Sequence, residues 1–208
     1  MRKHLEVIPL IIGTLATNCY IVFDTESLDA VIIDPGDDAD YIQRIISDRK
    51  LHPGKIIATH GHFDHILGVT ELQLAYNIPF SLHTRDVFLV RNMQSSAKHF
   101  LGIEVDMPPQ IDSKLKKVER IGKTTLHIIE TPGHTPGSVC LYQKEMKILF
   151  TGDLLFASGA VGRTDFSYSN RKNLEDSLTK IFKFPQETII YPGHGQSSTL
   201  SRERAYYP

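Results

Sequence analysis

The stretch "ATHGHFDHILGV" at residues 58–69 places three histidines and one aspartate within six positions: His60, His62, Asp64 and His65. It continues the apolar run "KIIA" at residues 55–58, which predicts a short strand leading into the cluster. Imidazole nitrogens and carboxylate oxygens are common ligands of zinc, iron and manganese. The stretch therefore predicts a metal site in a loop at the end of a strand.

Three more donors occupy equivalent positions later in the chain. His134 lies in "TPGHTPG" (131–137), Asp153 ends "KILFTGD" (147–153), and His194 lies in "YPGHG" (191–195). Each follows a predicted strand in a turn rich in glycine or proline, where a rigid scaffold displays functional groups. Seven donors exceed one tetrahedral site, so we predict two metal ions with one bridging carboxylate.

The remaining histidines stand alone in the sequence. His4, His52, His99 and His127 are predicted to be structural or simply exposed. His83 ends the predicted strand "PFSLH" and could support the site, although a structural role is favoured.

The pattern of strands and helices predicts an α/β fold. Apolar runs of strand length fall in both halves of the chain, and helical stretches at 38–50, 66–77 and 171–184 lie among them. This order favours two mixed β-sheets flanked by helices, an αββα sandwich, in a single domain over residues 1–208. Residues 91–113 lack strong periodicity and are predicted to be an irregular segment at the rim of the site.

Composition narrows the class of protein. The 208 residues carry a net charge of −1, which gives no footprint for nucleic acid or an anionic membrane. Cys19 and Cys140 are predicted to be buried free thiols. No stretch has the ~18 apolar residues of a membrane span, and Glu6 and Pro9 interrupt the apolar N-terminal run. We therefore expect a cytoplasmic protein with no membrane or nucleic-acid partner.

The motifs "THGHFDH", "TPGHTPG", "TGD" and "YPGHG", in this order, resemble those of the metallo-β-lactamase superfamily across residues 5–196. Within it, "TNCYIV", "IIDPGDD" and "GDLLFASGAVGRTDF" are similar to short forms of glyoxalase II, the hydroxyacylglutathione hydrolases. The resemblance implies one ion bound by His60, His62 and His134. It implies a second bound by Asp64, His65 and His194, with Asp153 bridging the two.

The resemblance also implies a reaction. The site would hold two divalent metal ions, and zinc is favoured over iron or manganese. These ions would supply a bound hydroxide near neutral pH, which would attack a small-molecule acyl thioester such as S-D-lactoylglutathione. Asp64 is the expected catalytic residue, because it could orient the nucleophile. Arg163 and Asp165 in "VGRTDF" are predicted to form a buried ion pair that holds the loop after Asp153.

One part of the family pattern is missing. Full-length glyoxalase II has a C-terminal helical domain that contributes to its glutathione site, and only 14 residues follow His194 here, so we expect no such domain. Lys98, Arg202 and Arg204 are candidates for glutathione contacts by charge alone, and a solvated surface position is favoured for each.

Other activities remain open at this point. A persulfide dioxygenase with one iron at His60, His134 and Asp153 and a lactonase with all seven ligands are the alternatives. A β-lactamase is less favoured, because binuclear β-lactamases usually place a cysteine where Asp153 stands. A nuclease of this superfamily would normally have an added substrate-binding domain and a basic surface, and neither is evident in the sequence. The complete set of donors disfavours a non-catalytic binding module.

Overall fold

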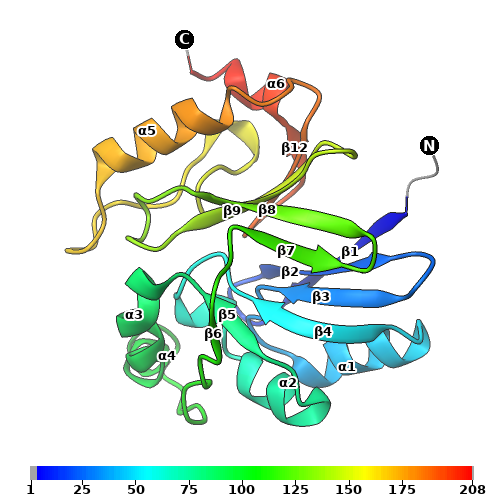
Figure 1. Ribbon diagram of the computed structural model, residues 1–208. Coiled ribbons are helices and arrows are strands. Elements are labelled where there is room, and N and C mark those ends of the chain that lie inside the picture. Colours follow the sequence, from blue (N-terminus) through cyan, green and yellow to red (C-terminus); the bar gives the residue numbers. More distant parts are fainter. Residues whose placement is uncertain (1–3, 208) are drawn as a thin grey trace.

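The computed structural model describes residues 4–207 and shows two six-stranded β-sheets packed face to face, with helices on both outer faces (Figure 1). Each sheet contains both parallel and antiparallel strand pairs. The predicted αββα sandwich is therefore confirmed.

The first sheet has the strand order β1-β2-β3-β4-β5-β6. It begins with an antiparallel meander and continues with parallel strands that are linked through helices on its outer face. The strands are β1 (Leu5–Ile12), β2 (Thr17–Asp24), β3 (Asp29–Ile33), β4 (His52–Ile57), β5 (Phe80–Leu82) and β6 (Ser113–Lys114). The N-terminal run forms two of these strands, β1 and β2, with the turn at Gly13 between them.

The second sheet has the order β12-β11-β10-β9-β8-β7. Its strands are β7 (Val118–Ile121), β8 (Thr124–Glu130), β9 (Val139–Gln143), β10 (Ile148–Gly152), β11 (Ile189–Pro192) and β12 (Ser198–Thr199). Strands β8 and β10 are both antiparallel to β9, and β11 is parallel to β10. The carboxyl ends of β8, β10 and β11 therefore meet at one edge of the sandwich.

Buried aliphatic and aromatic side chains fill three layers. Tyr20, Ile57, Leu141 and Phe150 belong to the layer between the two sheets. On the outer faces, the first sheet is covered by α1 (Ala39–Asp48), α2 (Val69–Tyr76), α3 (Val87–Arg91) and α4 (Met93–Leu101), and the second by α5 (Arg171–Ile181) and α6 (Leu200–Arg204). Short 3-10 turns form at η1 (Phe63–His65), η2 (Thr84–Asp86) and η3 (Ala157–Gly159).

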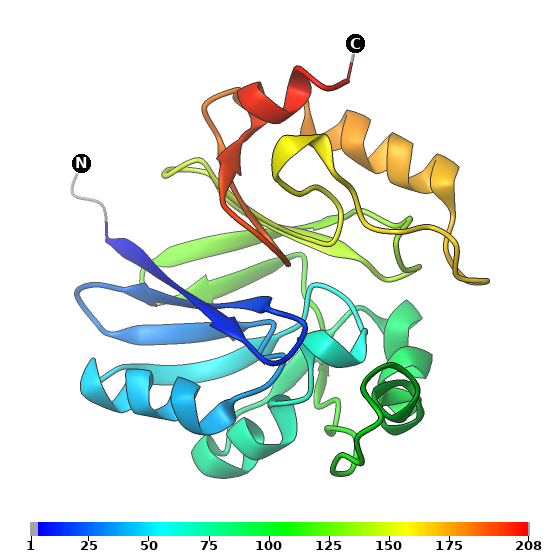
Figure 2. The same ribbon diagram turned by 180° about the vertical axis from the view of Figure 1, so that it is seen from behind.

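The segment 91–113 is more ordered than the sequence predicted. Helix α4 occupies residues 93–101 and buries Met93 and Ala97, while only residues 102–112 are irregular before β6 begins. Five polar positions in "MQSSAKHFL" hide its helical period, and only two of its side chains, Met93 and Ala97, are buried against the core. In Figure 2, α4 and the loop after β10 both lie on the right-hand side of the view.

Candidate metal centre

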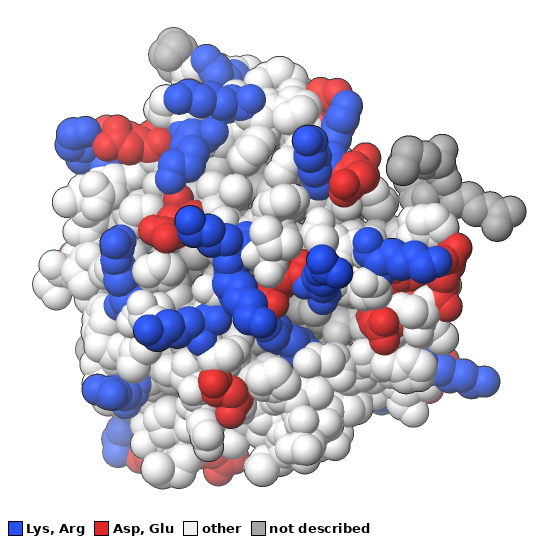
Figure 3. Space-filling view, in the orientation of Figure 1, with Lys and Arg blue, Asp and Glu red and all other residues white. Residues whose placement is uncertain are grey.

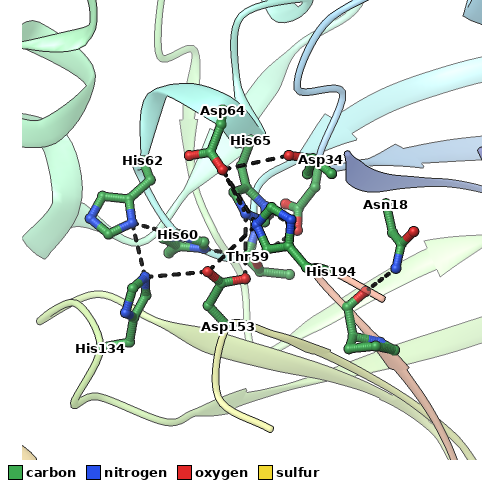
Figure 4. A network of polar contacts seen from close by, with 12 residues as sticks. Asn18, Asp34, Thr59, His60, His62, Asp64, His65, His134, Asp153 and His194 are labelled. Atoms are coloured by element: carbon green, nitrogen blue, oxygen red, sulfur yellow. Dashed lines mark hydrogen bonds and ion pairs between the residues drawn. The ribbon is translucent and has the colours of Figure 1, made fainter. Parts of the chain in front are cut away.

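The seven predicted donors converge at the edge where the strands end (Figure 4). Four of them follow β4, and the other three, His134, Asp153 and His194, follow β8, β10 and β11. The two sheets are joined at this edge, because the amide of Val139 donates to the carbonyl of Thr59, and Thr17 forms a β-bridge with His194. Strand direction therefore accounts for the meeting of residues that are far apart in the chain.

The first group of donors is formed by three histidines. Nδ1 of His62 lies 3.0 Å from Nε2 of His60 and 2.9 Å from Nε2 of His134. The opposite nitrogens are already used: Nδ1 of His60 lies 3.1 Å from Thr59 Oγ1, and Nδ1 of His134 lies 2.9 Å from the carbonyl of Arg163. We infer that both Nδ1 atoms carry the proton, which leaves the three facing nitrogens with lone pairs for an ion.

The second group combines Asp64, His65 and His194. Oδ2 of Asp64 lies 3.4 Å from Nε2 of His194 and 3.8 Å from Nε2 of His65. Asp153 lies between the two groups: its Oδ1 is 3.4 Å from His65 Nε2, and its Oδ2 is 3.5 Å from His134 Nε2. This carboxylate thus presents one oxygen to a histidine of each group.

Unsatisfied atoms show that the donor set fits a metal ion. Nε2 of His65 and Oδ1 of Asp153 are fully buried, and neither has a hydrogen-bond partner among the described residues. A buried polar atom without a partner is costly, and a positive ion would satisfy both. The set contains only nitrogen and oxygen donors, as sites for zinc, iron or manganese do.

Burial and neighbouring charges set the protonation of the cluster. Burial, together with the nearby His134, lowers the pKa of His62 to about 3. Burial would favour the neutral acid of Asp153, but the adjacent histidines, first His65, hold its pKa well below the usual range. Burial would likewise raise the pKa of Asp64, but His65 and then His194 outweigh it and lower that pKa. Neutral His62 and two ionised aspartates are the forms that bind a metal ion.

Two buried aspartates that the sequence analysis did not select hold the ligand loops. Asp34 accepts hydrogen bonds from the amide and the hydroxyl of Thr59, at 2.6 and 2.7 Å, and lies 3.0 Å from Nδ1 of His65. Asp86 accepts from the amides of Gly61 and Gly137, at 2.9 and 2.7 Å, which joins the loop after β4 to the loop after β8. Only the position of Asp34 at the end of the run "AVIID" could have indicated its role.

The predicted ion pair between Arg163 and Asp165 forms, but the prediction that it is buried was wrong. Two hydrogen bonds of 2.6 Å join the guanidinium to the carboxylate, and both side chains are more than half exposed. The guanidinium also lies 4.4 Å from the ring centre of Phe166. Both residues belong to the irregular segment between β10 and α5 and not to a strand packed between the two sheets, so the pair stays in contact with water.

A cavity of about 420 Å³ opens above the donors. His62, Asp64, His134, Asp153 and His194 contribute to its lining. Its other walls are built by residues of the loop before β2, of η1, of α4 and of the loop after β10: Leu15, Phe63, Ser96, Phe100, Phe156, Gly162, Arg163, Phe166 and Tyr168. Segment 91–113 therefore contributes to the rim of the site, as predicted.

The other singled-out residues lie outside this centre. Nδ1 of His83 accepts a hydrogen bond from the amide of Arg85, so this histidine caps η2. None of His4, His52, His99 and His127 belongs to a donor group among the described residues. Lys98 pairs with Glu104, and neither Arg202 nor Arg204 lines the cavity.

Comparison with known proteins agrees with this geometry. Residues 12–194 match the family model of the metallo-beta-lactamase superfamily, and the chain belongs to that family. It is 30% identical to the hydroxyacylglutathione hydrolase GloC of Haemophilus influenzae over 209 residues, covering 99% of this chain and 97% of the relative.

Two solved structures are also similar. The BLEG-1 B3 metallo-beta-lactamase superimposes with a TM-score of 0.90 at 32% identity, covering 98% of both chains. The di-iron-bound form of TTHA1623 superimposes with a TM-score of 0.86 at 34% identity, covering 96% of this chain and 97% of the other. Family membership places this protein among metal-dependent hydrolases, and no helix among residues 4–207 has the length and apolarity to cross a membrane.

Proposed function

We propose that this protein hydrolyses acyl thioesters with two divalent metal ions. The observation that carries the proposal is the convergence of two groups of three donors on either side of Asp153, at the floor of one cavity. His60, His62 and His134 would bind one ion, Asp64, His65 and His194 the other, and Asp153 would bridge them. Zinc is the proposed metal, and iron is the first alternative because of the di-iron relative.

Bound ions would lower the pKa of a water molecule and polarise the reacting carbonyl. Asp64 reaches the cavity through an ionised carboxylate, so it can accept a hydrogen bond from that water and orient it toward the carbonyl carbon. In the balanced reaction the water oxygen would form the new bond to carbon and its two protons would pass to the solvent. The carbon–sulfur bond would break, and the thiolate would leave with the electron pair. A thiolate is a stable anion, so the reaction does not require an acidic side chain beside the sulfur.

The likeness to the hydroxyacylglutathione hydrolase of Haemophilus influenzae supports thioesters as the substrate class. The test is the release of thiol from S-D-lactoylglutathione and from uncharged acyl thioesters by protein loaded with zinc, iron or manganese. We expect turnover with at least one metal, and we expect His62→Ala to abolish it while circular dichroism stays unchanged. Absence of thiol release with every substrate and every metal would refute the proposal.

A second candidate is hydrolysis of a β-lactam, favoured by the likeness to the BLEG-1 enzyme. The chemistry is the same attack on a carbonyl, with an amide nitrogen as the leaving group. Nitrogen is a poorer leaving group than sulfur and needs a proton at that atom. Nitrocefin hydrolysis in the same metal-loaded samples decides between the two, and faster turnover of nitrocefin than of every thioester would favour the second candidate.

A further inference from the structure

The cavity above the metal centre has two aromatic walls. On one side, the ring of Phe166 lies 5.3 Å from that of His62 and is stacked with Tyr168 at 5.2 Å. A second aromatic wall of the same cavity is formed by Phe63 and Phe100, which stack at 5.9 Å, and Phe156 lies 6.1 Å from His194. An aromatic ring therefore lies beside each group of metal donors, Phe166 beside the first and Phe156 beside the second.

Apolar side chains on these walls are left facing water. Phe100 is 50% exposed and Leu15 is 42% exposed, although both line the cavity. Large exposed apolar groups around a concave site cost free energy until a ligand covers them. An apolar ligand group would remove this surface from water, and each buried methylene would tighten binding on the order of fourfold.

The cavity offers little to a charged ligand group. Among the described residues, Arg163 is the one Lys or Arg side chain that lines it, and its Nε and Nη2 already donate hydrogen bonds to the carboxylate of Asp165. The basic side chains gather elsewhere: Figure 3 shows them on the face over β6 and β7, and Lys55, Lys116 and Arg120 line a separate hollow there. A glutathione group carries two carboxylates, which would lie against the aromatic walls without an unpaired cation.

From this arrangement we propose that the substrate is an uncharged acyl thioester with apolar groups on both sides of the reacting carbonyl. The wall of Phe166 and Tyr168 binds one group, and the wall of Phe63 and Phe100 binds the other. This inference rests on the proposed thioester hydrolysis and narrows its substrate class. Glutathione thioesters are then poor substrates, because their thiol group is charged.

The test varies the two sides of the substrate separately. Acetyl, butyryl and hexanoyl groups are each joined to glutathione and to N-acetylcysteamine, a neutral thiol, and kcat/KM is measured by thiol release. We expect kcat/KM to rise with acyl length on both thiols, on the order of fourfold per methylene until the wall is covered. At equal acyl length we expect the neutral thioester to exceed the glutathione thioester at least about tenfold, since a buried unpaired charge is costly.

Substitutions in the two aromatic walls show which side chains cause the dependence of kcat/KM on the substrate. Phe100→Ala and Phe166→Ala should each flatten the dependence on one side of the substrate, and Phe100→Ala should leave the metal content unchanged. Leu74→Ala is the matched control, because Leu74 is 81% exposed on α2 and does not line the cavity. An equal or higher kcat/KM for the glutathione thioesters, or no gain with acyl length, would overturn the inference.

A binding measurement separates this inference from the proposed reaction. Calorimetry on chelator-treated protein compares S-hexyl-N-acetylcysteamine with S-hexylglutathione, two thioethers that cannot be hydrolysed. We expect tighter binding of the neutral thioether, with loss of this preference in Phe100→Ala or Phe166→Ala. If no thioester is hydrolysed but the neutral thioether binds more tightly, the thioesterase assignment fails while the apolar cavity stands. Equal binding of the two thioethers, or tighter binding of the glutathione thioether, would contradict the inference that the cavity prefers a neutral ligand.

Discussion

The phenolic oxygen of Tyr168 lies 2.9 Å from Nε2 of His62, on the side of the imidazole that faces away from the other histidines. Because Nδ1 faces the metal-binding position, the ring proton is on Nε2, and Nε2 donates a hydrogen bond to the phenolic oxygen of Tyr168. This hydrogen bond fixes the plane of the His62 ring. A partner of this kind commonly changes metal affinity by about 10- to 100-fold when it is removed.

Tyr168→Phe should therefore weaken the binding of one of the two metal ions by about 10-fold or more, without changing the fold. Competition with a chromophoric chelator measures the affinity, and circular dichroism checks the fold. Tyr41→Phe on α1 is the control, because Tyr41 does not contact the donor groups. Unchanged affinities for both ions would show that the hydrogen bond does not position His62.

The loop that carries His194 passes very close to the bridging carboxylate. A Cβ atom added at Gly193 would lie 2.2 Å from Oδ1 of Asp153 and 2.8 Å from Cε1 of His65. Gly193→Ala should displace both side chains and reduce metal affinity on the order of tenfold or more. In the control Gly54→Ala, the nearest atom is a carbonyl oxygen 4.0 Å away, which is an ordinary contact. Full metal occupancy in Gly193→Ala would show that Asp153 is not needed where the structure places it.

The lowered pKa of His62 predicts how the metal-free protein responds to acid. In the unfolded chain His62 takes up a proton near pH 6.5, whereas in the folded chain its pKa is about 3, chiefly because of burial. The unfolded state therefore binds more protons between these values, and the contribution of His62 to stability falls as the pH is lowered.

His62→Gln removes this proton uptake. Between pH 6.5 and pH 4, the free energy of unfolding of the wild type should fall relative to that of the variant by up to about 1 kcal/mol per pH unit. Urea unfolding of chelator-treated samples measures both proteins. A constant difference between them over this range would contradict the lowered pKa.

The thiols provide a prediction that is independent of the metals. Cys19 and Cys140 are both fully buried, and burial raises the pKa of Cys140 to about 12. At neutral pH this group is therefore a thiol, whereas the thiolate is the reactive form. Neither cysteine should react with Ellman's reagent in the folded protein, while two should react after unfolding in guanidinium chloride. Rapid reaction of one thiol in the folded protein would disagree with this burial.

The sequence predicted the architecture and the positions of the donors because both depend on short local patterns. A strand followed by a glycine-rich turn and a histidine recurs, and strand direction brings these turns to one edge of the sandwich. The environment of Arg163 was not predictable in the same way: its pairing with Asp165 is local in sequence, but its exposure depends on where the folded chain places the loop.

The residues that hold the metal ligands in place could not be predicted from local sequence patterns either. Asp86 lies in η2 and joins Gly61 to Gly137, two glycines that only the folded chain brings together. Tyr168 is 106 positions from His62 and has no motif of its own. Helix α4 was not predicted because only two of its residues are buried, which is too few to give a clear helical period in the sequence. Each of these depends on tertiary contacts between segments that carry no signal separately.

The most direct test of the central claim combines metal analysis with turnover in one sample of purified, metal-loaded protein. The account predicts close to two ions per chain, thiol release from acyl thioesters, and loss of both the full metal content and the turnover in His62→Ala. One iron per chain, with oxygen consumed on addition of glutathione persulfide and no thiol released from any thioester, would contradict it.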